Sequence, residues 1–108
     1  MEKTNILPGK VQELKDQGQK MFSYTSDKGD VFYFKKPNKT DILFFQNEVS
    51  SNTNTPLIPV EKFIRKLFCG ENAEVFVQYI EEKPLSINNI LEHAIKDMFD
   101  QNFIVNDI

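Results

Sequence analysis

Three kinds of side chain in this sequence could take part in chemistry, and each lacks the partners that the chemistry needs. His93 is the only histidine and Cys69 the only cysteine. The segment around His93, EHAIK, lacks the second histidine of a zinc-binding helix, and no histidine near Cys69 in the sequence would activate its thiol. Glu81 and Glu82 are adjacent, so on a helix they would point to different faces and would not form an acid and base pair. We therefore predict no catalytic residue, no metal site and no cofactor, and a protein that is not an enzyme.

A basic recognition site is a second possibility, in the stretch VFYFKKPNKTDILFF, residues 31–45, where lysines lie between aromatic side chains. The overlapping segment KGDVFYF is superficially like the aromatic strand of RNA-recognition modules, in which a basic residue and a glycine precede base-stacking aromatics. However, Asp30 stands where an aromatic residue is expected, and Val31 where a small residue is expected. We therefore predict no nucleic-acid partner and interpret the stretch as the joint between a strand and a helix.

The charge distribution also argues against a protein that binds a phosphate backbone. The chain has 13 Lys and Arg against 16 Asp and Glu, a net charge of -3. Residues 1–70 hold eleven basic and eight acidic side chains, a balance of +3, whereas residues 71–108 hold two basic and eight acidic side chains, a balance of -6. Phosphate-backbone binders usually have a basic excess. The acidic last third is either an ordinary solvated surface or one end of a subunit that packs head to tail on copies of itself.

Length and composition indicate one ordered domain. The 108 residues are 40% hydrophobic and include ten Phe, which is enough for a core of its own. The single cysteine cannot form an internal disulfide, which fits a reducing compartment. No run of about 18 apolar residues suits a membrane span. We predict a cytoplasmic protein without a membrane partner.

The element expected to position the aromatic residues is a β-hairpin. The segment MFSYTSDKGDVFYF, residues 21–34, alternates aromatic and polar residues on both sides of a turn, in which Gly29 can adopt a positive φ. Pro37 cannot donate to a strand ladder, so the second strand should stop before it. Asn38 is then a suitable N-cap, with Asp41 in the first helical turn.

Helical spacing dominates the rest of the chain. The first helix should run from Asn38 to about Ser50, with Ile42, Phe45 and Val49 on one face. The clearest amphipathic helix should begin at Pro59 and be closed by Gly70. Its apolar positions fall at i, i+3, i+4, i+7 and i+8: Val60, Phe63, Ile64, Leu67 and Phe68.

Two further helices complete the expected fold. Residues 73–82 suit a strand almost as well, but Asn72 as a cap and Pro84 just past the end favour a helix. Ser86 should cap a last helix, whose apolar face carries Ile87, Leu91, Ala94, Ile95 and Met98. The sequence thus predicts an α+β fold, an N-terminal β-hairpin packed on a bundle of about four short helices. We expect a polar lead-in over residues 1–20, either flexible or a short helix ended by Gly18, one domain over residues 21–99, and a tail or added strand over residues 100–108.

The order of elements around residues 31–45 resembles the tail assembly chaperones of long-tailed bacteriophages and prophages. In that family an N-terminal aromatic strand runs into a K-P-x-K-x-D joint and a helix containing FQ, which reads here YFKKPNKTDILFFQNE, residues 33–48. The segment EEKPLSINNILEHAI, residues 81–95, is similar to the family's acidic turn with proline before its final helix. The resemblance covers about residues 21–99, and the polar residues 1–20 and the Asn- and Thr-rich loop at 51–55 depart from it.

The resemblance implies a non-enzymatic protein of the bacterial host cytoplasm that coats the helical tape measure protein and recruits tail tube subunits. The partner-binding residues would be apolar side chains of two helical segments, unless these build the domain's own core: Phe44, Phe63, Leu67 and Phe68. The alternative is a small phage or mobile-element protein that regulates a host protein through its acidic C-terminal third, with Glu81 and Glu82 as contacts. A homo-oligomer is a further possibility, because the unpaired edge of a hairpin is a template for association.

Overall fold

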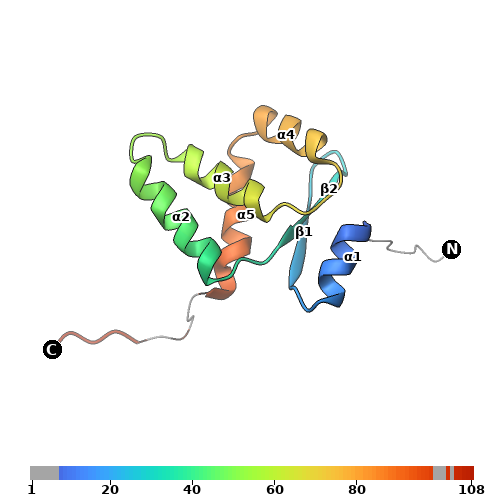
Figure 1. Ribbon diagram of the computed structural model, residues 1–108. Helices are drawn as coiled ribbons and strands as arrows, with labels where there is room; N and C mark the ends of the chain where they lie inside the picture. Colours follow the sequence, from blue (N-terminus) through green and yellow to red (C-terminus); the bar gives the residue numbers. More distant parts are fainter. Residues whose placement is uncertain (1–7, 99–101, 103) are drawn as a thin grey trace.

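The structure, a computed structural model, describes residues 8–98, 102 and 104–108. A short helix precedes a two-stranded antiparallel hairpin, and four α-helices and a 3-10 turn follow it (Figure 1). The bounds in chain order are α1 Gly9–Asp16, β1 Met21–Thr25, β2 Val31–Lys35, α2 Lys39–Ser51, α3 Leu57–Leu67, α4 Ala73–Glu82, α5 Ser86–Ile95 and the 3-10 turn Lys96–Met98. The predicted α+β class is confirmed, and residues 73–82 form the helix that the cap and proline signals favoured.

The hairpin has the predicted register, which gathers its aromatic rings on one face. Phe22 pairs with Phe34 and Tyr24 with Phe32, and paired residues of an antiparallel ladder share a face. Phe32 and Phe34 are fully buried on that face. Gly29 in the turn has φ +91°, a conformation that side chains other than glycine rarely adopt. The hairpin therefore presents an aromatic face that the helices must cover.

The joint between β2 and α2 forms as the sequence predicts. The Asn38 side chain accepts the Asp41 N–H at 2.9 Å, and the Asp41 carboxylate accepts the Asn38 N–H at 3.0 Å. This reciprocal capping box satisfies two backbone donors and contributes about 1 kcal/mol. Asp41 is only 4% exposed, so the joint is also part of the packed structure.

Both predicted ends of α3 are wrong, for two different reasons. The helix begins at Leu57 rather than at Pro59, because the first-turn N–H groups have no helical partner and a proline is tolerated at any of those positions. It ends at Leu67, and Phe68 is extended, because the Cys69 N–H donates to Tyr33 O of β2 at 2.9 Å. Gly70 is therefore not a helix cap.

Gly70 lies where two neighbouring side chains leave little space for a Cβ atom. A Cβ atom at this position would lie 2.9 Å from the ring of Phe68 and 2.9 Å from the side-chain oxygen of Asn72. A side chain at position 70 would therefore require Phe68 or Asn72 to shift.

The caps predicted for α4 and α5 are also corrected. Asn72 stands at the N-terminal boundary of α4, but its side chain makes no cap hydrogen bond and donates to Val31 O at 3.2 Å. Ser86 is the first residue of α5 rather than its cap, and its hydroxyl accepts a hydrogen bond from Tyr79 at 3.2 Å. In both cases the side chain that was predicted to cap a helix instead forms a hydrogen bond with another element.

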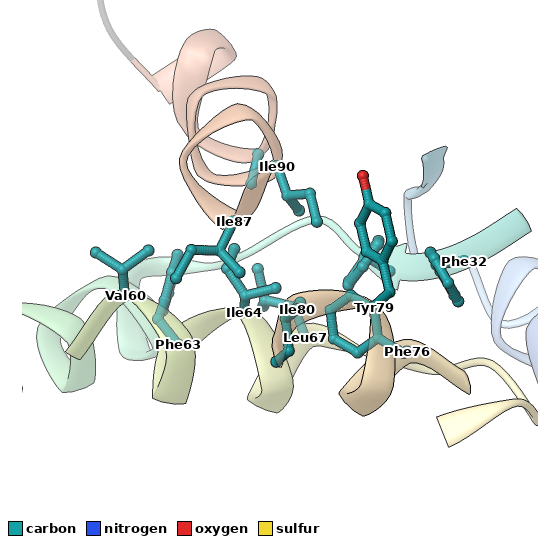
Figure 2. Close-up of a cluster of buried hydrophobic side chains, with 12 residues drawn as sticks. Phe32, Val60, Phe63, Ile64, Leu67, Phe76, Tyr79, Ile80, Ile87 and Ile90 are labelled. Carbon is teal, nitrogen blue, oxygen red and sulfur yellow. The ribbon is translucent and has the colours of Figure 1, made fainter. Parts of the chain in front are cut away.

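The core lies between the aromatic face of the hairpin and the helices α3, α4 and α5. Figure 2 shows Ile64 and Phe63 of α3 beside Ile87 of α5, with Phe76 of α4 near Phe32 of β2. The buried residues of this core are Phe32, Phe34, Val60, Phe63, Ile64, Leu67, Phe76, Tyr79, Ile80, Ile87, Ile90 and Ala94. The apolar stripe predicted for α3 is thus the centre of the core.

The opposite face of the hairpin is covered by α1, which the sequence had left open between a flexible lead-in and a short helix. Val11 of α1 is 1% exposed, and with Ser23 and Tyr33 it lines a small hollow beside the hairpin. Gly18, with φ +91°, follows the helix end as expected. At the other terminus residues 104–108 have no helix or strand and extend away from the body (Figure 1).

Candidate functional site

Two of the predicted partner-binding residues are core residues. Phe63 and Leu67 are both 0% exposed and lie inside the cluster between α3, α4 and α5. A side chain without solvent exposure cannot contact a partner in this conformation. For these two residues the structure supports the alternative that they build the domain's own core.

Phe68 is partly buried and is held in an aromatic stack. Its ring lies parallel to that of Phe76, with centroids 4.9 Å apart and an interplanar angle of 2°, and edge-on to Phe34 at 5.7 Å. Such ring pairs contribute about 0.5–1.5 kcal/mol beyond the burial of their area. Phe68 therefore joins the segment after α3 to the hairpin and to α4.

Phe44 is the one predicted apolar contact that reaches a hollow on the surface. It is half-buried on α2 and lines a hollow of about 440 Å³ with Ile58, Glu61, Lys62 and Arg65 of α3. The Lys66 ammonium lies 5.1 Å from the centre of the Phe44 ring. This hollow is mostly walled by charged side chains, so it suits an apolar helical face less well than the groove described next.

A groove between α2 and α5 is more apolar than the hollow beside Phe44. It measures about 340 Å³ and is lined by Ile42 and Phe45 of α2 and by Ile95 and Met98 at the end of α5 and in the turn after it. Lys39 and Gln46 complete its lining. The helix α3 packs against both α2 and α5, the two helices whose residues flank the groove.

The sequence places the apolar groove residues on two separate helical faces and does not predict that they line one groove. The spacing places Ile42 and Phe45 on one apolar helical face and Ile95 and Met98 on another, without indicating that the two faces lie together. In the structure Met98 is 46% exposed, and Val49, the next residue of the α2 row, is 43% exposed. Each of these two apolar rows thus extends beyond the buried core. Apolar rows longer than a domain of this size can bury would be the signal of the groove in the sequence.

The acidic residues Glu81 and Glu82 are exposed at the end of α4, next to the hairpin turn. The Glu82 carboxylate lies 3.5 Å from the Lys28 ammonium, and Lys83 forms an ion pair with Asp27 of the same turn. The hydrogen bond between Asp27 and Lys83 lowers the pKa of Asp27 and raises that of Lys83. Lys28 of the turn thus pairs with one carboxylate of the acidic segment, whereas Asp27 of the turn pairs with one of its two basic residues. The role of Glu81 and Glu82 as partner contacts stays a prediction.

Cys69 is buried in the segment after α3 that lies beside β2. Burial raises the pKa of its thiol, which keeps the sulfur protonated, and the S–H group donates to Leu67 O at 3.3 Å. Within residues 8–98, 102 and 104–108, no group of three or more His, Cys, Asp or Glu side chains is placed to hold a metal ion. No helix in the described part of the chain is long and apolar enough to cross a membrane.

His93 lies on α5 beside the hairpin, in contact with an aromatic ring and near two lysines. Its ring centroid is 4.9 Å from that of Phe22, and the Lys36 ammonium lies 5.4 Å from the Phe22 ring and 3.2 Å from the Asp97 carboxylate. Partial burial lowers the pKa of His93, the charges of Lys36 and Lys96 lower it further, and Asp97 opposes them. The histidine is thus held in its neutral form to lower pH than a free imidazole.

We expect the NMR titration of His93 to have its midpoint below the ordinary histidine value of 6.5. Because the folded protein binds this proton less readily than the unfolded chain, the folded state gains stability as pH rises through that region and loses it as pH falls below 6.5. Lys36→Met should raise the midpoint, whereas Lys62→Met, on the outer face of α3, should not. A midpoint at or above 6.5 in the wild-type protein would contradict this description of the site.

Comparison with known proteins supports the fold and goes no further. No protein-family model matches the sequence, and no curated protein matches it either. A solved structure described as an uncharacterised protein, rbstp2171, from Bacillus stearothermophilus is similar to this chain with a TM-score of 0.65 and 20% sequence identity. The similarity covers 91% of this chain and 98% of that one. At this identity the likeness shows a shared fold over nearly the whole of both chains.

Proposed function

We propose that this protein is a non-enzymatic tail assembly chaperone that acts in the cytoplasm of a bacterial host and binds the helical tape measure protein of a phage. The observation that carries the proposal is the apolar groove between α2 and α5, lined by Ile42, Phe45, Ile95 and Met98. The resemblance of residues 33–48 and 81–95 to the chaperone family supplies the identity of the partner.

The groove has the form that an amphipathic helix requires. A helix that lies in an apolar groove places anchors at i, i+3, i+4 and i+7, so it needs a row of apolar contacts along one direction. Ile42 and Phe45 line the groove on α2, and the exposed Val49 continues their row beyond it, because a spacing of three and four residues puts all three on one helical face. Ile95 and Met98 provide the facing wall.

The charge at the edge of the groove suits a helix that carries an acidic residue beside its apolar face. Lys39 lies at the edge of the groove, in the first turn of α2, and makes no ion pair with any residue that the structure describes. A tape measure protein exposes long apolar helical faces before the tail tube covers them, and contiguous apolar surface of that kind promotes aggregation. Burying such a face in the groove would keep the long protein in solution, and tail tube subunits would be recruited to the coated complex.

Co-expression with the tape measure protein encoded by the same phage genome tests the proposal. We expect a larger share of the tape measure protein in the soluble fraction when this chain is present, and a complex that survives gel filtration. An unchanged soluble share, with this chain itself abundant and folded, would overturn the proposed function.

A further inference from the structure

The two edges of the hairpin differ in how their backbone groups are satisfied. Hydrogen bonds from Lys36 N to Lys20 O and from Ser26 N to Asp30 O close the two ends of the ladder. In an antiparallel ladder every second residue pair is hydrogen-bonded. The hydrogen-bonded pairs between these two ends are therefore Phe22 with Phe34 and Tyr24 with Phe32. The remaining residues point their N–H and C=O groups outward: Met21, Ser23 and Thr25 on β1, and Val31, Tyr33 and Lys35 on β2.

The outward edge of β2 is covered by the chain that follows α3. The Cys69 N–H donates to Tyr33 O at 2.9 Å, and the Asn72 side-chain amide donates to Val31 O at 3.2 Å. Phe34 and Phe68 form a short antiparallel bridge at the same place. This edge is therefore closed to another strand.

The outward edge of β1 is open. Among the described residues no backbone or side-chain group bonds the outward N–H and C=O groups of Met21, Ser23 and Thr25. The helix α5 reaches Phe22 on the aromatic face, and α1 lies over the other face, where its Val11 and Lys15 line a hollow with Met21, Ser23 and Tyr33. The side chains of Ser23 and Thr25 are exposed, so another strand could approach.

The sequence of β1 also lacks the features that keep an open edge from pairing. Natural sheets protect such edges with lysine, proline, inward-pointing charges or a bulge. The strand reads MFSYT, which contains no proline and no charged residue, and its pairing with β2 runs without a bulge. Every outward position carries a side chain that fits beside a neighbouring strand.

We propose that the β1 edge pairs with the β1 edge of a second copy, which joins the two hairpins into one four-stranded antiparallel sheet. The outward residues are centred on Ser23, so a two-fold axis there pairs Met21 of each copy with Thr25 of the other and Ser23 with Ser23. All outward N–H and C=O groups of both strands then find partners. This proposal does not depend on the chaperone function.

Charge complementarity favours a second copy over an unrelated extended segment. In the two-fold register Lys20, just before β1, lies opposite Ser26 of the second copy and next to its Asp27. Two such contacts form, one at each end of the paired strands. Asp27 also pairs with Lys83 in its own copy, so the contact would join two lysines to one carboxylate.

Amide hydrogen exchange by NMR at low and high protein concentration tests the pairing residue by residue. The amides of Phe22 and Tyr24 should be protected at both concentrations, because they bond within the hairpin. The amides of Met21, Ser23 and Thr25 should exchange fast at low concentration and slow by about tenfold or more once nine-tenths of the molecules are paired. If these three amides exchange equally fast at both concentrations, the proposal is overturned.

A single substitution at the two-fold axis provides the second test. Ser23→Lys places two ammonium groups directly opposite each other, and like charges at facing positions destabilise a strand pair. Sedimentation equilibrium should show the wild-type protein and Ser50→Lys, an equally exposed change on α2, forming dimers as concentration rises, while Ser23→Lys stays monomeric. A Ser23→Lys protein that dimerises like the wild type overturns the proposal, and if the variant does not fold, the exchange measurement on the wild type decides.

Discussion

Replacement of Phe34 by alanine is expected to lower the free energy of unfolding by about 3–5 kcal/mol. Phe34 is 0% exposed and its ring contacts three others, at centroid distances of 5.3 Å from Phe22, 5.7 Å from Phe68 and 5.4 Å from Phe76. These partners come from β1, from the segment after α3 and from α4, so removal of the ring opens a cavity where three parts of the fold meet. A domain of this length has a total stability of roughly 5–15 kcal/mol, so the loss would be a large fraction of the whole.

Urea unfolding followed by circular dichroism measures this loss, and Phe44→Ala is the matched control. Phe44 loses the same atoms but is half-buried on α2 beside a charged hollow, so we expect a loss of about 1 kcal/mol. The dependence of the free energy on urea should keep its slope in both variants if the unfolded state is unchanged. Equal losses in the two variants would contradict the central position that the structure gives Phe34.

Local patterns were sufficient to predict the hairpin, the four helices after it and the main core stripe. The spacing of Val60, Phe63, Ile64 and Leu67 describes one helical face, and all four are buried against the hairpin and α5. Asn38 as the N-cap and Asp41 in the first turn were also predicted, because they are only three residues apart, but the returning hydrogen bond from Asn38 N–H to Asp41 was not. These features rest on interactions within one or two helical turns.

Three features that the sequence mispredicted depend on residues outside the helix concerned. Gly70 was expected to close α3, but the chain leaves the helix earlier because Cys69 bonds β2, far back in the sequence. Asn72 and Ser86 were expected to cap helices, but their side chains bond Val31 and Tyr79 instead. A capping residue and a residue held by a tertiary hydrogen bond look the same in a single sequence.

The candidate site could be predicted only in part. The sequence left open whether Phe63 and Leu67 bind a partner or build the core, because periodicity shows that a helix has an apolar face but not what covers it; in the structure both are buried. The groove between α2 and α5 needed the packing of α3 against both helices, which no pattern within either helix records.

Met98→Asp is expected to reduce binding of the tape measure protein by about tenfold or more. The side chain of Met98 lines the groove and is 46% exposed, so the change places a carboxylate in the proposed contact while removing little of the core. Loss of an anchor at the centre of an interface costs roughly 2 kcal/mol or more, and each 1.4 kcal/mol is about a tenfold change in affinity.

Leu85→Asp is the matched control, because Leu85 is 66% exposed, lies before α5 and does not line the groove. The decisive measurement is the amount of soluble tape measure protein recovered on co-expression with the wild-type chain, with Leu85→Asp and with Met98→Asp. We predict equal recovery with the first two and recovery near that of the tape measure protein alone with Met98→Asp, provided that all three chains are folded. Full recovery with Met98→Asp, or no recovery with the wild type, would contradict the account of this groove as the site that binds an apolar helix.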